Sequence, residues 1–168
     1  MKNIFLIGMM GCGKSTIAKL LSKKLSIPFY DIDSEIENIM ELSIKDFFYK
    51  YGEKRFRMIE SSFFSEMIKS NKGIYSTGGG IVESKANRQL LMNHGFSIFL
   101  DCSIDVLIQR IGHNIESRPL LSKNYKIELE DIFSSRKKQY EESAHLIINV
   151  DKYSKDKIVE TIYGKINV

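Results

Sequence analysis

The sequence predicts an α/β fold with a parallel sheet, and three observations support this. Short apolar runs alternate along the chain with patterns of helical spacing. The first run, residues 4–7, is continuously apolar, which suits a strand buried on both faces, and a glycine loop and a helical pattern follow it at once. With 168 residues, 43% of them hydrophobic, the chain has the size and composition of one compact domain.

In the first half of the chain, apolar residues recur at helical spacing from Ile17 to Leu25, and a proline ends that helix. Residues 28–33 form a predicted short strand, and Ser34 to Glu37 has the capping-box pattern of a helix start. A helical stretch follows over residues 43–71, in two pieces broken near Gly52.

The second half continues the alternation. The predicted strands are residues 73–77, 96–101 and 145–150, and the predicted helices are residues 88–93, 128–143 and 155–166. Between residues 112 and 126 the chain is polar and contains Pro119, which is typical of a mobile loop on a compact body.

The net charge of +4 is too small to indicate a nucleic-acid partner, although it is compatible with small anionic ligands. The apolar run over residues 4–10 has the character of a secretory or lipoprotein signal, but its length is at the bottom of the range for one. No other run approaches the ~18 apolar residues of a membrane span. We therefore expect a cytoplasmic protein with reduced cysteines and with no membrane or nucleic-acid partner.

Residues 8–15 match in full the phosphate-binding pattern of glycine, four residues, then Gly-Lys-Ser. A strand is predicted before the pattern and a helix after it, which is the context the motif needs. The backbone N–H groups of Gly11, Cys12 and Gly13 would surround phosphate oxygens, and the helix N-terminus would add partial positive charge. An ordinary glycine-rich turn and a nucleophilic Cys12 at a helix start are the alternatives.

The side chains after the glycines carry the chemistry of the loop. Lys14 would reach the β- and γ-phosphates, Ser15 would ligate Mg²⁺, and Thr16 would contact the α-phosphate. GTPases share this loop, but residues 71–74, Asn-Lys-Gly-Ile, lack the aspartate of a guanine-binding signature. A small kinase fits the length of the chain better.

Five motifs together resemble the shikimate kinase family over essentially the whole chain. They are the glycine loop, Tyr30–Asp33, Phe56–Glu60, Thr77–Gly80, and Arg118–Leu121 followed by Arg136 and Tyr140. The resemblance implies a three-layer α/β/α P-loop kinase fold with a central five-stranded parallel sheet and a mobile lid. It places a single domain over residues 1–168, with a substrate-binding helical region at about 33–61 and the lid at about 112–124.

The same resemblance implies an activity. The γ-phosphoryl group of ATP would be transferred, with Mg²⁺, to the 3-hydroxyl of shikimate, a step of chorismate and aromatic amino acid biosynthesis. The protein would act as a monomer on these small molecules.

Two aspartates lie at the end of the second predicted strand. Asp31 and Asp33 are two residues apart, so on a strand they share a face and point into one cleft. The resemblance assigns Asp31 to the metal and Asp33 to the substrate, where it would orient the 3-hydroxyl or accept its proton. A pair of helix-capping acids is the alternative, since Asp33 lies where a cap is expected.

A substrate carboxylate requires arginines, whose planar guanidinium can form two parallel hydrogen bonds with it. Arg57 lies three residues before Glu60 on a predicted helix, so the two can pair. Arg136 lies four residues before Tyr140, on the inward stripe of its helix. Either arginine could be a snorkelling side chain without a ligand, and the resemblance favours the substrate role.

Three consecutive glycines, Gly78, Gly79 and Gly80, follow the third predicted strand. They would normally mark a tight turn. The resemblance implies instead a wall of the substrate pocket, with Gly79 offering its N–H. Thr77, just before them, is expected to help order the magnesium shell.

The remaining candidate site residues are expected in the lid and around the nucleotide base. Arg118 precedes a proline, which disfavours a helical backbone at Arg118. The resemblance implies that Arg118 closes on the phosphates as a catalytic arginine. The alternative is that Arg118 is a solvated loop residue. Arg110 would stack on the adenine. The family often covers the other face with a proline, absent from residues 151–155, so Tyr153 or Lys155 would take its place.

Two other functions stay open at this point. A gluconate kinase or a nucleoside monophosphate kinase would share the loop, and gluconate also carries a carboxylate. A regulatory module that binds nucleotide without phosphoryl transfer is of a different class. Retention of Lys14, Ser15, Asp31, Asp33 and Arg118 together argues against such a module.

Overall fold

The computed structural model describes residues 2–112, 119–121 and 124–166. A parallel five-stranded sheet lies at its centre, in the order β2-β3-β1-β4-β5. The strands are β1 (Asn3–Ile7), β2 (Phe29–Asp31), β3 (Ile74–Ser76), β4 (Gly95–Asp101) and β5 (Leu146–Asn149). The predicted sheet is therefore confirmed.

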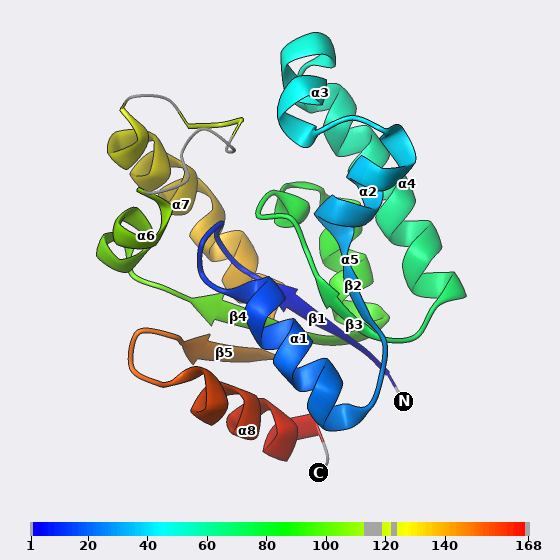
Figure 1. Ribbon diagram of the computed structural model, residues 1–168, viewed down its shortest axis with the longest axis vertical. Coiled ribbons are helices and arrows are strands. Elements are labelled where there is room, and N and C mark those ends of the chain that lie inside the picture. The colour runs from blue at the N-terminus through cyan, green and yellow to red at the C-terminus, as the bar shows by residue number, and fades with distance from the viewer. Residues whose placement is uncertain (1, 113–118, 122–123, 167–168) are drawn as a thin grey trace.

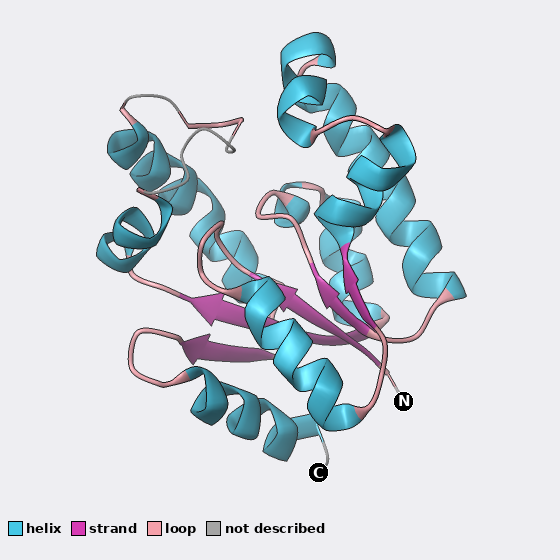
Figure 2. Ribbon diagram, in the orientation of Figure 1, coloured by secondary structure: helices cyan, strands magenta, loops and turns pink. Residues whose placement is uncertain are grey.

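Helices cover both faces of this sheet (Figures 1 and 2). In Figure 1, α1 and α8 lie on one face, α4, α5 and α7 lie on the other, and α2 and α3 stand at one end beside the start of α4. The helices are α1 (Lys14–Leu25), α2 (Ile32–Met40), α3 (Ile44–Tyr51), α4 (Glu53–Ser70), α5 (Lys85–Asn93), α6 (Ile104–Ile111), α7 (Tyr125–Glu142) and α8 (Lys155–Ile166), with a 3₁₀ turn, η1 (Ile81–Glu83). The three-layer α/β/α architecture is the predicted one. No helix in the described part of the chain is long and apolar enough to cross a lipid bilayer.

Burial of the central strand explains its apolar sequence. Every residue of β1 is buried, because helices cover both faces of the sheet there. Phe5 of β1 packs edge-on against Phe64 of α4, with ring centroids 5.5 Å apart. Since all five strands run in the same direction, their carboxyl ends meet at one edge, where parallel sheets bind ligands. At this edge the glycine loop follows β1, Asp31 ends β2 and Thr77 follows β3.

The start of α2 differs from the prediction. The helix begins at Ile32 instead of Ser34, and its N-cap is Asp31, whose carboxylate accepts a hydrogen bond from the Ser34 N–H at 3.4 Å. The predicted capping box is therefore wrong, because Glu37 instead accepts the N–H of Ile44 at the start of α3. Asp33 lies in the first helical turn and is not a cap. The strand-face argument that paired the two aspartates is wrong for the same reason.

One helix was not predicted at all. Helix α6 follows β4 directly, and its buried residues Leu107 and Ile111 are four apart, a spacing that could have identified it. Helices α5 and α7 each begin three residues earlier than predicted. Arg118, expected in the lid, lies outside the described residues.

Candidate functional site

The glycine loop has the shape of an anion-binding site. Gly11 and Gly13 have φ angles of 80° and 101°, in the left-handed region that glycine tolerates best. Gly13 is the N-cap of α1 and provides no side-chain cap, so the first N–H groups of α1 remain available to a phosphate. The Lys14 ammonium donates to the carbonyl oxygens of Gly8 and Met9, at 2.9 Å each, and this positive charge lies across the loop.

Cys12 is buried within this loop, and its Sγ lies 4.0 Å from the Lys14 ammonium. Burial of the thiol disfavours the nucleophile alternative, since a reactive cysteine must be partly exposed.

Three oxygen-bearing side chains meet beside the loop. The Ser15 hydroxyl donates to Asp31 Oδ2 at 2.6 Å and lies 3.0 Å from the Ser76 hydroxyl at the end of β3. The sequence pointed to Thr77 here, but the Thr77 hydroxyl donates to the Leu6 carbonyl at 3.0 Å. Ser76 was missed, because no spacing pattern marks a serine at a strand end.

A cavity of about 300 Å³, the P-loop cleft, lies in front of these groups. It is lined by Met10, Gly11, Gly13, Lys14, Ser15, Thr16, Asp31, Asp33, Ser76, Thr77 and Gly79. Hydroxyl and carboxylate oxygens are ligands that Mg²⁺ prefers, and Mg²⁺ usually binds through one or two carboxylates plus substrate phosphates. No cluster of three or more His, Cys, Asp or Glu suited to a metal occurs among the described residues.

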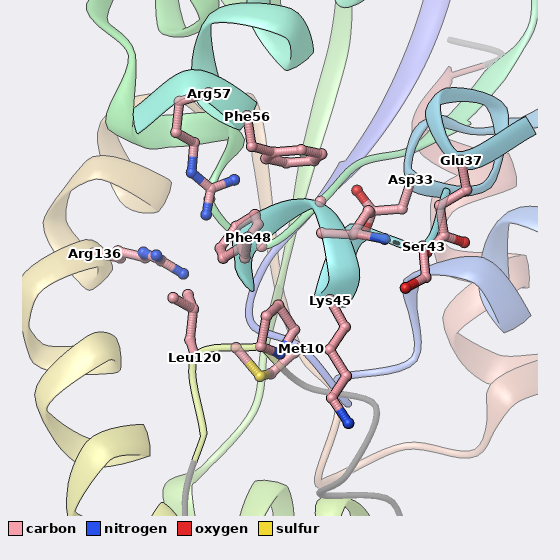
Figure 3. Close-up of a pocket in the computed structure, with 15 residues that line it drawn as sticks. Met10, Asp33, Glu37, Ser43, Lys45, Phe48, Phe56, Arg57, Leu120 and Arg136 are labelled. Carbon is pink, nitrogen blue, oxygen red and sulfur yellow. Dashed lines mark hydrogen bonds between the residues drawn. The ribbon is translucent and has the colours of Figure 1, made fainter. Parts of the chain in front are cut away.

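A second cavity of about 490 Å³, the arginine pocket, adjoins the first, since the two share lining residues. Figure 3 shows the side chains around it. Arg57 from α4 and Arg136 from α7 reach into it from one side, and Asp33 lies on the other side (Figure 3). The pocket is lined by Met10, Asp33, Glu37, Ser43, Ile44, Lys45, Phe48, Phe56, Arg57, Gly78, Gly79, Gly80, Pro119, Leu120 and Arg136. The predicted substrate residues Asp33, Arg57, Arg136 and the three glycines are thus brought together.

Carboxylates hold the Arg57 guanidinium in place. It pairs with Glu53 at 2.8 Å and, as predicted, with Glu60 at 2.9 Å, on the same helix. Burial works against its charge, but Glu60 and Glu53 outweigh burial and hold the pKa of Arg57 above its ordinary value. Arg136 is buried, as the inward stripe of its helix predicted, and it forms an ion pair with Glu83.

Asp33 connects the two cavities, because it lines both the arginine pocket and the P-loop cleft. Burial and the neighbouring Asp31 raise the pKa of Asp33 to about 6, while Lys14 and Arg57 oppose the shift. The carboxyl group is therefore ionised in most molecules at neutral pH and can accept a proton within the cleft.

Two of the three glycines, Gly78 and Gly80, are required by the charged groups that pack on them. A Cβ on Gly78 would lie 2.6 Å from Asp33 Oδ1 and 2.7 Å from Glu60 Oε1, and one on Gly80 would fall on the Arg57 guanidinium. The Tyr140 hydroxyl donates a hydrogen bond to the Gly79 carbonyl. The glycine run thus forms a wall of the pocket, as expected, and also allows the charged side chains to approach closely.

A third cavity of about 340 Å³ flanks the other side of the glycine loop. Arg110 lines it together with Tyr153, Lys155 and loop residues including Gly11, Cys12, Gly13 and Thr16. The guanidinium of Arg110 donates to the Cys12 carbonyl at 3.4 Å. Arg110 and the two side chains expected to cover an adenine therefore share one cavity next to the phosphate loop.

Glu60 gives a stability prediction. Burial raises its pKa to about 7, although Arg57 opposes the shift, and its Oε1 has no hydrogen-bond partner among the described residues. The folded protein therefore holds a proton that the unfolded chain releases near the ordinary pKa of 4.5, so this contribution to stability is lost as the pH rises towards 7. For Glu60→Gln, we expect the free energy of unfolding relative to wild type to rise by about 2 kcal/mol from pH 5 to pH 8.

Urea unfolding at the two pH values measures this difference. Glu66→Gln, on the exposed face of the same helix, is the matched control, and the effect assigned to Glu60 is the part in excess of it. A Glu60→Gln difference no larger than that of Glu66→Gln would contradict the prediction.

The fold and the adjoining cavities define the class to which this protein belongs, the small P-loop kinases. Asp33, which lines both cavities, stands between the phosphate-binding loop and the pocket for an acceptor. A family model described as shikimate kinase matches residues 10–167. The chain belongs to the shikimate kinase family.

Individual relatives agree with this family. A shikimate kinase of Persephonella marina is 40% identical over 166 residues, which are 99% of each chain. The solved structure of a shikimate kinase from Acinetobacter baumannii in complex with shikimate is 31% identical, has a TM-score of 0.94, and covers 99% of this chain with 93% of its own. A gluconokinase from Sinorhizobium meliloti has a TM-score of 0.60 at 15% identity, covering 95% of this chain and 87% of its own, which shows the fold alone.

Proposed function

We propose that this chain transfers the γ-phosphoryl group of ATP to the 3-hydroxyl of shikimate, a step of aromatic amino acid biosynthesis. Membership of the shikimate kinase family supports this reaction. The observation that carries it in the structure is the position of Asp33, on the walls of both the P-loop cleft and the arginine pocket. An acceptor hydroxyl held beside Asp33 would face phosphates held on the glycine loop.

The nucleotide side of the reaction falls to α1 and its loop. The uncapped N-terminus of α1 and the Lys14 ammonium offer positive charge to the phosphates. Ser15 and Asp31, 2.6 Å apart, would hold Mg²⁺, which when bound neutralises charge that develops on the phosphates. Arg110, with Tyr153 or Lys155, would hold the adenine in the third cavity.

The acceptor side of the reaction falls to the arginine pocket. Arg57 and Arg136 would bind the shikimate carboxylate, and the glycine run would lie along the ring. Asp33 would orient the 3-hydroxyl and accept its proton as the phosphoryl group moves. Arg118 lies outside the described residues, and we propose that it closes on the phosphates; Pro119 and Leu120 after it line the arginine pocket.

The setting of the enzyme is also a proposal. We propose that the enzyme is cytoplasmic, and that it is a monomer because one chain supplies both cavities from its own residues. Light scattering after gel filtration would test this, and a dimer mass would contradict it.

The activity is tested with an assay that couples ADP release to a colour change. With Mg²⁺ and ATP we expect rapid turnover on shikimate and little on gluconate or nucleoside monophosphates. Nucleoside monophosphates lack the carboxylate that the paired arginines would bind, and gluconate, which has one, lacks the ring that would lie along the glycine wall. Equal turnover of gluconate would overturn the assignment. ATP binding without turnover of any acceptor would favour a regulatory module.

A further inference from the structure

Glu83 joins the two arginines of the pocket. It is the last residue of η1, three positions after the glycine run. Its Oε1 forms an ion pair with Arg136 Nη2, and its Oε2 lies 3.6 Å from Arg57 Nε. One carboxylate thus contacts both guanidinium groups, one oxygen to each, as the carboxylate of a ligand would.

The two arginines depend on Glu83 to different degrees. Arg57 also has close partners on its own helix, Glu53 and Glu60. Arg136 has a side chain only 6% exposed, and within the described part of the chain its other carboxylate is Glu53, at 4.0 Å. A buried guanidinium without a partner is strongly unfavourable. Without substrate, Glu83 is therefore the main neutralising group of Arg136.

The charge around the pair disfavours a further anion. Glu53, Glu60 and Glu83 surround two arginines, so the cluster carries no excess positive charge when its carboxylates are ionised. The carboxylate of a ligand that binds the same guanidinium groups is repelled by these glutamates, and the repulsion is stronger because the site is partly desolvated.

Glu83 is also able to leave. Its side chain is 35% exposed, whereas that of Glu60 is 1% exposed, so Glu83 can turn into water without moving the backbone. Glu83 does not line the arginine pocket itself, so it holds the two guanidinium groups from beside the pocket, and a ligand carboxylate inside must draw them away from it. Its departure leaves the walls of the pocket intact.

We propose that Glu83 is a built-in competitor for the arginine pair: it neutralises Arg57 and Arg136 in the free enzyme and is displaced by the carboxylate of the substrate. This rests on the proposed function. Glu83 therefore sets the affinity for shikimate, and it favours ligands whose own carboxylate can replace it.

The test is Glu83→Gln, which keeps the size and the hydrogen-bond acceptor but removes the charge. We expect the Kd for shikimate, measured by calorimetry without nucleotide, to fall roughly three- to tenfold, since the ligand no longer displaces an ion pair. The KM for shikimate should fall in parallel, with kcat and the KM for ATP within about twofold of wild type. Glu142→Gln, on the same helix as Arg136 and 58% exposed, removes the same charge at a distance and should change neither constant.

The two possible roles of Glu83 predict changes of opposite sign in the Kd for shikimate. If Glu83 only supports Arg136, loss of its charge raises the Kd and KM for shikimate, and an unchanged Kd also overturns the proposal. Glu83→Ala provides a second measurement, because it removes the acceptor as well: a lower Kd supports the competitor and a higher one contradicts it. Binding and turnover of shikimate by the wild-type enzyme test the proposed function separately, since the role of Glu83 is tested only by the ratio of the variant Kd to the wild-type Kd.

Discussion

Asp33→Asn is expected to lower kcat for shikimate by about 10³, within the range found for loss of a general base. The amide has nearly the same shape as the carboxylate but cannot accept the proton of the 3-hydroxyl. Asp33 does not cap α2, because Asp31 does, so the start of the helix should survive. The measurement is steady-state turnover of shikimate, with ATP binding followed by calorimetry.

The melting temperature of Asp33→Asn distinguishes loss of catalysis from loss of the fold. Burial raises the pKa of Asp33 to about 6, so the charged group is already held unfavourably, and its neutral replacement should not lower the melting temperature. Asp105→Asn, in the first turn of α6, is the matched control and should keep full activity. Wild-type turnover in Asp33→Asn would reduce Asp33 to a structural residue, and weakened ATP binding would place it in the nucleotide site.

Lys14→Met is expected to reduce kcat/KM by about 10³ or more, because it removes the positive charge of the phosphate-binding loop. Lys14 is only 8% exposed, and its ammonium donates to the carbonyl oxygens of Gly8 and Met9. Methionine preserves the length of the side chain but neither the charge nor these two bonds. The Kd for ATP should therefore rise as well.

Lys23→Met, in an exposed position on the same helix, is the control for loss of a lysine from α1. Its kinetic constants should match those of wild type. A Lys14→Met enzyme within tenfold of wild-type kcat/KM would mean that the N-terminus of α1 suffices to hold the phosphates.

The sequence alone predicted the parts of this protein that depend on local pattern. The buried strand, the glycine loop and α1 are contiguous, so spacing alone defines the phosphate site. Arg57 and Glu60 are neighbours on one helix, and their ion pair at 2.9 Å follows from that spacing.

Contacts between distant segments could not be read in this way. Ser76 meets Ser15 only because β3 pairs with β1, and Glu83 meets Arg136 only because η1 packs beside α7. No one-dimensional spacing encodes either contact. The two aspartates show a related limit: they do share a cleft, but through the first turn of a helix and not through the face of a strand.

The wall common to the two cavities has a consequence for inhibitor design. Met10, Asp33 and Gly79 line both the P-loop cleft and the arginine pocket, so the two cavities are adjacent. A single synthetic molecule with a carboxylic-acid ring at one end and a phosphate mimic at the other could therefore occupy both. Linking two such fragments by a spacer of suitable length can increase affinity by about 10²–10⁴ without any new contact. Because the glycine loop is common to a large class of kinases, the selectivity of such a compound would come from its acidic end.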